Sequence, residues 1–328
     1  MVLPDLMQAA FINNGELILQ ADTPRPKPSE NEVLLKVLVA GICSTDLAII
    51  NGYAGFKGTP GHEFVGLVAE LGSAVASAWQ GRRVVAEINQ WCGHCEYCTS
   101  EKYAHCTNRE VIGIRASNGA FAEYLLVNVN TLVHVPDQLT DEQAVFIEPL
   151  AAAFRILEQI ERIEEHKNIL IIGAGKLGQL IARVLALTDN EISVSTKHVK
   201  QKHLLKDISV NCIDEREIIS MGYDLVIETS GHISGFKRAI KACCSLGYIV
   251  LKSTYLPSTV DLSQVIIREL TLIGSRCGPF EKAIKAMEAN LIDPRCLIEK
   301  IYPLSEIGNA IDFSQQKGTM KVLIKPGI

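Results

Sequence analysis

A strand-like run followed by three glycines places the strongest constraint on how this chain can fold. Residues 168–172 are mostly apolar, Gly173-Ala-Gly175-Lys-Leu-Gly178 follows at once, and residues 179–187 have the composition of a helix. This order is typical of a dinucleotide-binding unit, because the glycines permit a tight turn and the helix N-terminus faces the pyrophosphate. A glycine-rich turn without a ligand is the alternative. The residues predicted to contact a cofactor here are Gly173, Gly175, Lys176, Leu177 and Gly178.

Strand-like segments recur after this turn. They lie at residues 191–196, 223–228, 248–251 and 270–273, with helical segments between them and a further helix that runs to about residue 289. Strands that alternate with helices in this way form a parallel, doubly wound sheet. We therefore predict an α/β fold of the Rossmann type for this part of the chain.

The end of the second strand of this sheet bears on the choice of cofactor. An NAD-binding site carries Asp or Glu about 20 residues past the glycines, where the carboxylate holds the ribose hydroxyls. The sequence has Ser195, Thr196 and Lys197 there and no acid. Hydroxyls and cations suit a 2′-phosphate, which favours NADP(H). A solvated basic turn beside a site that takes NAD(H) is the alternative.

The N-terminal part of the chain has the pattern of a β-rich domain. A turn at residues 13–15 (Asn-Asn-Gly) suits a hairpin, residues 32–39 form an apolar strand, and residues 118–124 return to strand. Residues 141–160 predict a helix that is broken at Glu148-Pro149, because proline lacks a backbone donor and clashes with the preceding turn. We place the domain boundary at that break.

Residues 61–75 bring metal-ligand side chains into this β-rich part. His62 and Glu63 stand together after Gly61, and imidazole and carboxylate groups are both ligands of zinc. Cys43 lies upstream and Glu148 downstream. A thiolate, an imidazole and a carboxylate from separate parts of a chain are typical of a catalytic zinc site with one open position. A His-Glu pair that is merely solvated in a turn is the alternative.

Four cysteines cluster at the spacing Cys-x2-Cys-x2-Cys-x7-Cys. Two-residue gaps allow consecutive thiolates to reach one ion, and four sulfurs close a tetrahedron with no open position. We predict a structural zinc in a lobe of residues 90–107, where it braces a loop and takes no part in chemistry. The neighbouring His94 and His105 are expected to be bystanders. The predicted ligands are Cys92, Cys95, Cys98 and Cys106.

Length, charge and cysteine content narrow the functional classes. A length of 328 residues favours two domains, and a net charge of −5 argues against nucleic acid and membranes as partners. The N-terminal residues lack the pattern of a signal peptide, and no apolar run reaches the ~18 residues of a membrane span. We therefore expect a cytoplasmic protein, in which the ten cysteines serve as metal ligands or buried thiols and not as disulfides.

These motifs together resemble the zinc-dependent branch of the medium-chain dehydrogenase/reductase family, which includes alcohol, polyol and threonine dehydrogenases. The resemblance extends from the N-terminus to about Lys325. It implies a GroES-like catalytic domain of residues 1–149 and 291–328 and a Rossmann domain of residues 150–290, with the tail rejoining the first domain. The residues that match the zinc signature of the family are Gly61, His62, Glu63, Gly66, Gly72 and Val75.

The resemblance also implies roles for individual residues. Cys43 and His62 are the firmest ligands of the catalytic zinc. The third ligand is a choice between Glu63, which polyol-dehydrogenase-like members use, and Glu148, whose position is often a cysteine in the family. Both carboxylates can exchange with water on the metal.

Proton transfer and histidine orientation are the other roles that the resemblance implies. Thr45 matches the hydroxyl that begins the proton relay of the family, with a helix cap as the alternative. Asp46 is expected to orient a ligating histidine. The outer histidine of the relay is replaced by Ala48, so the proton must leave by water or by another group.

The implied activity is reversible hydride transfer between an alcohol or polyol, or its carbonyl, and a nicotinamide cofactor. The resemblance implies two Zn²⁺ ions per chain, one catalytic and one structural. The expected cofactor is NADP(H), with NAD(H) as the alternative. A homodimer or homotetramer is expected. An NAD-linked polyol- or threonine-type dehydrogenase and a non-catalytic zinc- and nucleotide-binding redox sensor are the rival functions. The substrate, a small alcohol or carbonyl compound, is left open by the sequence.

Overall fold

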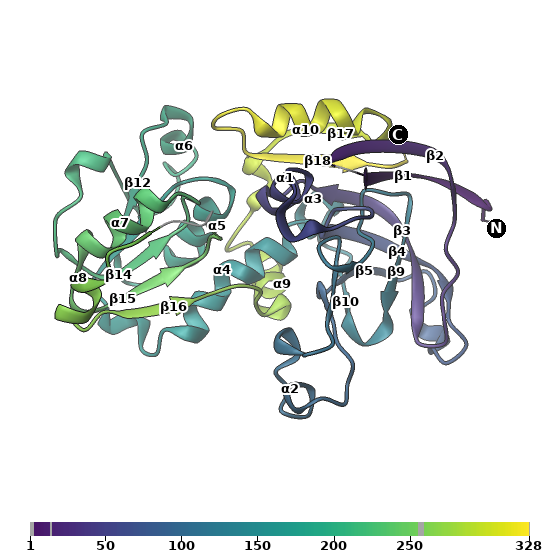
Figure 1. Cartoon of the computed structure of the whole chain (residues 1–328), viewed down its shortest axis with the longest axis horizontal. Coiled ribbons are helices and arrows are strands. Elements are labelled where there is room, and N and C mark those ends of the chain that lie inside the picture. Colours follow the sequence, from purple (N-terminus) through teal and green to yellow (C-terminus); the bar gives the residue numbers. More distant parts are fainter. Residues whose placement is uncertain (1–2, 14, 255–258, 328) are drawn as a thin grey trace. The chain divides into compact units, whose positions relative to one another are not determined.

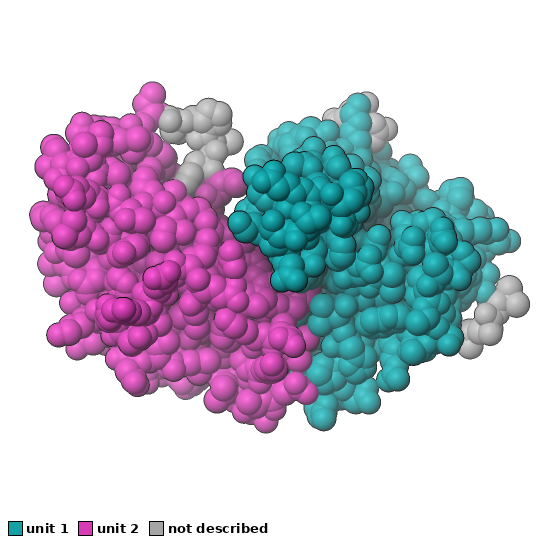
Figure 2. Space-filling model, turned by 90° about the horizontal axis from the view of Figure 1, so that it is seen from below, with its two compact units in different colours: residues 1–148, 293–328 teal, residues 149–292 magenta. Residues whose placement is uncertain are grey.

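The structure is a computed structural model that describes residues 3–13, 15–254 and 259–327. The chain forms two compact units, coloured separately in Figure 2. Residues 1–148 and 293–328 form the first unit, and residues 149–292 form the second. The first is mainly β and the second contains a parallel sheet with helices, so the predicted α/β class with a β-rich part is confirmed.

The first unit is built on a seven-stranded sheet (Figure 1) with β3 near its centre. Seven of the ten residues of β3 are buried, and β4, β9 and β18 all pair with this strand. The C-terminal strand β18 thus joins the middle of a sheet formed by N-terminal strands. The strands of this sheet are β3 (Glu32–Gly41), β4 (Glu63–Leu71), β5 (Arg83–Ala86), β9 (Tyr124–Asn128), β10 (Leu132–His134), β17 (Ile298–Pro303) and β18 (Lys321–Lys325).

Smaller elements complete this unit. The predicted hairpin is present as the antiparallel strands β1 (Leu6–Asn13) and β2 (Glu16–Pro24), and Asn14 of its turn lies outside the described residues. A three-stranded sheet contains β6 (Asn89–Gln90), β7 (Glu110–Ile112) and β8 (Ala116–Ser117). The helices are α1 (Ser44–Ile50), α2 (Glu96–Thr99), α3 (Asp141–Ala144) and α10 (Ile307–Gln315).

Two predicted elements of this region were wrong in their bounds. The strand predicted for residues 118–124 begins only at Tyr124, because residues 118–121 instead bond the backbone at residues 59–61 and 10. The predicted helix 141–160 breaks before Pro149. Helix α3 has a capping box at Thr140, and Pro149 lies in the first turn of α4 (Ile147–Gln159), where its missing N–H costs no hydrogen bond.

The second unit has a six-stranded sheet in which every pair is parallel. Its order is β13-β12-β11-β14-β15-β16, so the chain runs outward from β11 in one direction and then returns to continue from β14 in the other. This is the doubly wound order whose reversal point, between β11 and β14, receives ligands at the carboxyl ends of the strands. The strands are β11 (Asn168–Ile172), β12 (Glu191–Ser195), β13 (Asn211–Ile213), β14 (Tyr223–Glu228), β15 (Cys243–Leu251) and β16 (Thr271–Gly274).

Helices connect the parallel strands of this unit. Apolar residues of β11, β14 and β15 pack with those of α7 in one buried cluster. Among the described residues no helix is both long enough and apolar enough to cross a bilayer. The helices between strands are α5 (Lys176–Leu185), α6 (Val199–His203), α7 (Ile233–Ala242) and α8 (Ser263–Ile267), whereas α4 precedes β11 and α9 (Phe280–Glu288) follows β16.

Gly72 follows the last residue of β4 and lies in a tightly packed part of the first unit. A Cβ atom at this position would lie 1.9 Å from the carbonyl oxygen of Ser29. We expect Gly72→Ala to lower the free energy of unfolding by about 1–3 kcal/mol, because two backbone segments must separate. Gly308→Ala is the control, since Gly308 lies in α10 with open space around it, and it should stabilise by about 0.5–1 kcal/mol. Thermal and urea unfolding of both variants measure the difference, and equal stability of Gly72→Ala and the parent would contradict the packing argument.

Candidate active site and metal centres

Three of the predicted metal ligands lie together in the first unit. Cys43 is the N-cap of α1 just after β3, His62 precedes β4, and Glu63 is the first residue of β4. One ligand atom from each lies within 4.8 Å of the other two. His62 and Glu63 are buried and Cys43 is half-buried. A thiolate, an imidazole and a carboxylate at this separation suit a tetrahedral zinc ion with ligand bonds of about 2.0–2.3 Å.

The carboxylate of Asp46 holds this group in position. Its Oδ1 atom lies 2.9 Å from His62 Nδ1 and accepts from the N–H of Gly61, and its Oδ2 atom accepts from the N–H of Cys43 at 2.8 Å. Since Nδ1 faces Asp46, Nε2 is the nitrogen left for a metal. Burial alone would lower the pKa of His62, but Asp46 and Cys43 outweigh it and raise that pKa well above its usual value. This is the geometry predicted for a residue that orients a ligating histidine.

Glu63 forms a buried ion pair with Lys321, a residue that sequence reasoning missed. Lys321 Nζ donates to Glu63 Oε2, and both side chains are only 2% exposed. The pairing of β18 and β4 with β3 places both residues beside Gly41, where a Cβ would lie 2.6 Å from Glu63 Oε2. Burial would lower the pKa of Lys321, but Glu63 and Cys43 raise it, so the ammonium stays charged. The two residues are 258 positions apart, and no local pattern signals the pair.

Two other predicted residues occupy different positions from the ligand group. Glu148 does not join Cys43 and His62 within 4.8 Å among the described residues, and it lies half-buried in the first turn of α4. Thr45 Oγ1 lies 3.7 Å from Cys43 Sγ. Thr45 is the second residue of α1 and not its cap, so the alternative of a capping role was wrong. Ala48 lies farther along α1 and offers no group that could carry a proton.

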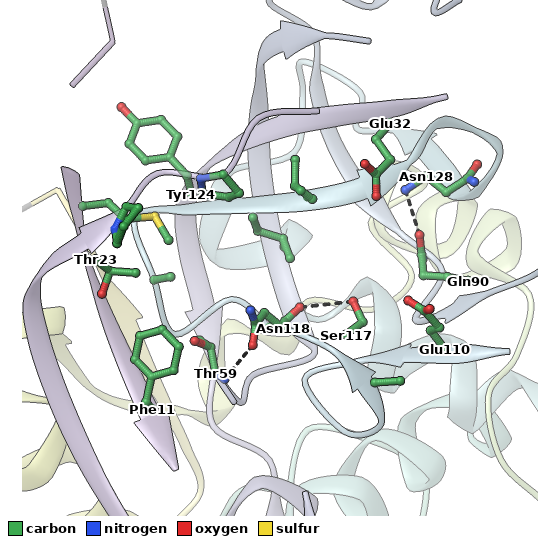
Figure 3. Close-up of a pocket in the computed structure, with 18 of the residues that line it drawn as sticks. Phe11, Thr23, Glu32, Thr59, Gln90, Glu110, Ser117, Asn118, Tyr124 and Asn128 are labelled. Atoms are coloured by element: carbon green, nitrogen blue, oxygen red, sulfur yellow. Dashed lines mark hydrogen bonds between the residues drawn. The ribbon is translucent and has the colours of Figure 1, made fainter. Parts of the chain in front are cut away.

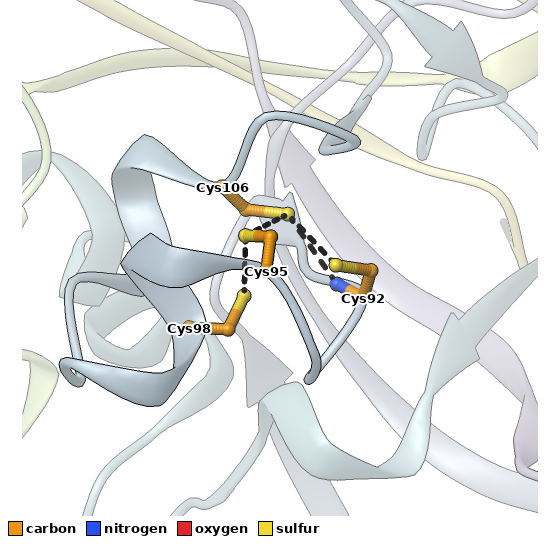
Figure 4. A group of neighbouring side chains, drawn as sticks. All are labelled: Cys92, Cys95, Cys98 and Cys106. Carbon is orange, nitrogen blue, oxygen red and sulfur yellow. Dashed lines mark hydrogen bonds between the residues drawn. The ribbon is translucent and has the colours of Figure 1, made fainter.

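The four clustered cysteines converge on one point (Figure 4). Neighbouring sulfurs lie 3.5–3.8 Å apart, close to the ~3.8 Å edge of a tetrahedron with zinc–sulfur bonds of ~2.3 Å and too far for a disulfide. Backbone N–H groups of Thr107 and Cys98 lower the pKa of Cys95 to about 5, whereas burial raises the pKa of Cys98 to about 12. A metal ion must therefore displace a proton from Cys98. His94 and His105 are exposed and outside the group.

The glycines of the turn after β11 differ in what the absence of a side chain allows at each position. Gly173 has φ +98°, which favours glycine. A Cβ on Gly178 would lie 2.1 Å from the carbonyl oxygen of Gly173, so only glycine lets α5 approach the turn this closely. Gly175, the N-cap of α5, faces open space, which leaves room for a ligand at the helix N-terminus beside Lys176 and Leu177.

The residues predicted to read the ribose lie at the end of β12, but they are not equivalent. Ser195 is buried, its carbonyl accepts from the N–H of Gly173, and its hydroxyl has no partner among the described residues. Thr196 is also buried, and its hydroxyl donates to Gln201 at 2.6 Å. Lys197 is exposed. Of the three, Lys197 alone presents an exposed polar group at the end of β12.

A cavity of about 470 Å³ lies elsewhere in the first unit (Figure 3). Its wall contains Thr59, Gln90 and Asn118, and it reaches Cys92 of the four-cysteine lobe. Gln90 accepts from the backbone of residue 128, and Asn118 accepts from the N–H of Thr59, so these wall groups bond one another (Figure 3). The cavity wall contains none of the three ligands of the candidate active site.

The buried ion pair between Lys321 and Glu63 leads to a prediction about the folding stability of the protein. Lys321→Met should lower the free energy of unfolding by about 3–5 kcal/mol, because Glu63 would keep a buried charge without its partner. The double variant Glu63→Gln with Lys321→Met should recover most of this loss. Lys325→Met is the matched control on the same strand, since its ion pair with Glu142 is partly exposed, and it should cost less than about 1 kcal/mol. Urea unfolding measures all three, and a loss for Lys321→Met no larger than that for Lys325→Met would refute the prediction.

The sequence of this chain is similar to those of known dehydrogenases. A sequence model of the alcohol dehydrogenase GroES-like domain matches residues 29–137. The D-arabitol-phosphate dehydrogenase of Enterococcus avium is 30% identical, over 98% of this chain and 95% of its own length.

Solved structures agree over nearly the whole chain. A zinc-binding dehydrogenase of Sinorhizobium meliloti bound to NADP has a TM-score of 0.88 and 26% identity, covering 98% of this chain and 100% of its own. A short chain alcohol dehydrogenase (rspB) of Escherichia coli with NADH has the same TM-score, 28% identity and the same coverage. The sequence relatives, the GroES-like segment and the fold show that this chain belongs to the zinc-type medium-chain dehydrogenase/reductase family and is an enzyme of the alcohol dehydrogenase type.

Proposed function

We propose that this oxidoreductase transfers hydride reversibly between an alcohol or polyol and NADP(H), with a catalytic zinc held by Cys43, His62 and Glu63. The observation that carries the proposal is the convergence of these three ligand atoms within 4.8 Å, with Asp46 behind His62. In this proposal the first unit is the GroES-like catalytic domain and the second is the Rossmann domain that binds the cofactor.

The chemistry of the site divides between the ion and the side chains around it. Zinc in such a site acts as a Lewis acid on the substrate oxygen. Asp46 fixes the ring of His62, and Lys321 donates to one oxygen of Glu63. The hydroxyl of Thr45 is placed beside Cys43 to take the proton from the substrate hydroxyl. Because Ala48 carries no titratable group, the proton continues to solvent through water.

Glu63 is the better supported third ligand. It lies within the group of ligand atoms, and Glu148 does not. The ion pair with Lys321 neutralises the carboxylate when it is not bound to metal, which makes exchange between the metal and water less costly than it would be for an unpaired buried charge. Glu148 remains the alternative ligand in this proposal.

The cofactor preference rests on the turn after β12. An acid that would hold the ribose hydroxyls of NAD(H) is absent, whereas the exposed Lys197 suits a 2′-phosphate. The relatives support both cofactors, since one solved structure is bound to NADP and the other to NADH.

The substrate class follows from the family and from the name of one relative. D-arabitol-phosphate dehydrogenase acts on a sugar alcohol, so a polyol or a polyol phosphate is the first class to test in this chain. The expected oligomer is a homodimer or a homotetramer. A redox sensor that binds zinc and nucleotide without turnover is the second candidate, and it requires that loss of Cys43 leave the function intact.

Two cysteine variants test the two metal sites. The parent should hold two zinc ions per chain, and Cys43→Ser and Cys92→Ser should each lose one. Cys43→Ser should abolish turnover but keep NADPH binding and thermal stability, because it removes an open-site ligand. Cys92→Ser should lower the melting temperature, because a structural zinc contributes folding free energy.

The exposed Cys296 supplies the control, and Cys296→Ser should keep both ions. Metal content is measured by mass spectrometry, turnover by nicotinamide absorbance with a panel of polyols, and stability by thermal unfolding. Full turnover in Cys43→Ser would rule out the catalytic role of this site, and unchanged stability in Cys92→Ser would rule out a structural metal.

The cofactor preference is tested by fluorescence titration with NADPH and NADH. We expect tighter binding of NADPH, and we expect Lys197→Met to weaken NADPH binding by about tenfold while NADH binding changes little, because one charge-assisted hydrogen bond to the phosphate is lost. Lys206→Met removes the same charge from another exposed lysine nearby in the sequence and should leave the ratio of the two dissociation constants unchanged. Tighter binding of NADH by the parent would contradict the preference.

A further inference from the structure

A chain of buried polar side chains connects the two turns that face the cofactor in the proposed site. Its centre is Gln179 of α5, which is fully buried. The Nε2 atom of Gln179 donates to the carbonyl oxygen of Ala174 at 3.3 Å and to that of Gln201 at 3.0 Å. Ala174 lies inside the glycine turn, and Gln201 lies in α6, just after the turn that follows β12 (Figure 1). The side-chain amide of Gln179 therefore joins the glycine turn to α6, the helix that follows the second turn.

The side chain of Gln201 closes the second turn on itself. Its Oε1 atom accepts from Thr196 Oγ1 at 2.6 Å, and Thr196 Oγ1 accepts from the backbone N–H of His198 at 3.3 Å. Gln201 is 8% exposed and Thr196 is 5% exposed. The hydroxyl of Thr196 is thus used on both its donor and its acceptor side within the protein, which differs from the direct cofactor contact predicted for this residue.

Arg183 determines which way the amide of Gln179 points. Its guanidinium donates to Gln179 Oε1 at 2.9 Å and to the carbonyl oxygen of Leu204, the C-cap of α6, at 2.7 Å. Because an arginine can only donate, the oxygen of Gln179 must face Arg183, and the nitrogen must face the two carbonyl groups. Helix α6 is therefore fixed to α5 at its middle residue, Gln201, and at its C-terminal end, Leu204.

The side chains outside this buried network are those that can reach a ligand. Lys197 in the turn after β12 is exposed, whereas the unpartnered hydroxyl of Ser195 just before it is buried, so Lys197 is the side chain of this turn that a ligand can reach. Their positions relative to the glycine turn depend on the network, since a fully satisfied buried polar network favours one arrangement over its alternatives. A lysine placed by a rigid turn loses less entropy on binding a phosphate than one on a mobile turn.

We propose that Gln179 and Gln201 are positioning residues that set the discrimination between NADPH and NADH. They hold the turn that carries Ser195 and Lys197 in a fixed place relative to the glycine turn, so that one nucleotide meets both turns at once. The proposal rests on the proposed function for its direction, namely that the 2′-phosphate improves binding. Neither glutamine side chain is assigned a contact with the cofactor.

The test is Gln201→Met, which keeps the length of the side chain and removes its hydrogen bonds. We expect the dissociation constant of NADPH to rise by about tenfold, the factor for one lost positioning interaction, and that of NADH to rise less than threefold. Gln143→Met is the matched control, because Gln143 is also 8% exposed and its Oε1 atom also accepts from a threonine just before its helix, but it lies in α3 of the first unit. That variant should lose stability without changing the ratio of the two constants.

Thr196→Val provides a second variant that preserves shape and removes the hydroxyl. If Thr196 acts through Gln201, the effects of Thr196→Val and Gln201→Met on the ratio will not add in the double variant. Additive effects would instead mean that Thr196 contacts the cofactor directly, and they would overturn the proposed role of Gln201. The proposed role of Gln201 is also overturned if Gln201→Met weakens the binding of both cofactors equally. It is overturned as well if Gln201→Met changes only the melting temperature, which is the result expected of Gln143→Met.

The two hypotheses fail separately in these measurements. The ratio of the two constants in the parent protein tests the proposed NADP(H) preference. The change of that ratio in Gln201→Met tests the positioning role, whichever cofactor the parent prefers. A parent that prefers NADH would refute the preference, and an unchanged ratio in Gln201→Met would refute the inference.

Discussion

The pairing of buried charges around Cys43 and His62 is the interaction on which the rest of the first unit depends. Asp46, Glu63 and Lys321 are each at most 2% exposed, and such groups are stable in a protein interior only with close partners. Lys321 comes from the last strand of the chain, whereas the other residues come from its first quarter. The insertion of β18 beside β3 therefore completes the electrostatics of the site, and it explains why the C-terminal segment belongs to the N-terminal unit.

The number and type of ligand atoms distinguish the two candidate metal centres. The four cysteines of the lobe supply four sulfurs, which leave a tetrahedral ion no free position and give it a structural role. The group of Cys43, His62 and Glu63 supplies three atoms of three chemical types, and its carboxylate also forms an ion pair with a lysine. This second arrangement leaves a position for a substrate oxygen, and its carboxylate has an alternative partner when it leaves the metal.

The second unit organises its site with neutral hydrogen bonds. Gln179 and Gln201 bond through neutral amide groups, and Lys197, the proposed phosphate contact, is exposed outside this network. Arg183 carries a charge, and it donates to the amide oxygen of Gln179 and to the backbone carbonyl oxygens of Gln179 and Leu204. A buried carboxylate in the same place would weaken the attraction of the turn for an anionic cofactor.

Short-range patterns in the sequence determined most of the fold class and the local motifs. The glycine turn after β11, the four-cysteine lobe and the His62-Glu63 pair were recognisable because each depends on residues close together in the chain, where spacing alone restricts geometry. Strand and helix bounds were correct where apolar runs were clear, as for β14. They failed at residues 118–124, where hydrogen bonds to a distant loop replaced a strand, and at residues 145–146, where α3 ends at its C-cap Val145 before α4 begins.

Only the tertiary structure decided which distant side chains share a site. The sequence offered Glu63 and Glu148 as equal candidates, and the pairing of β3 with β4 placed Glu63 beside Cys43 and His62. Lys321 and Gln201 gave no signal, because a lone lysine in a strand and a lone glutamine in a helix are ordinary surface residues until folding buries them. The sequence by itself determined the chemistry available to this protein, through residue types at short spacing. The fold decided which groups are used inside the protein and which are left for a ligand, since burial and partnership depend on contacts between segments far apart in the chain.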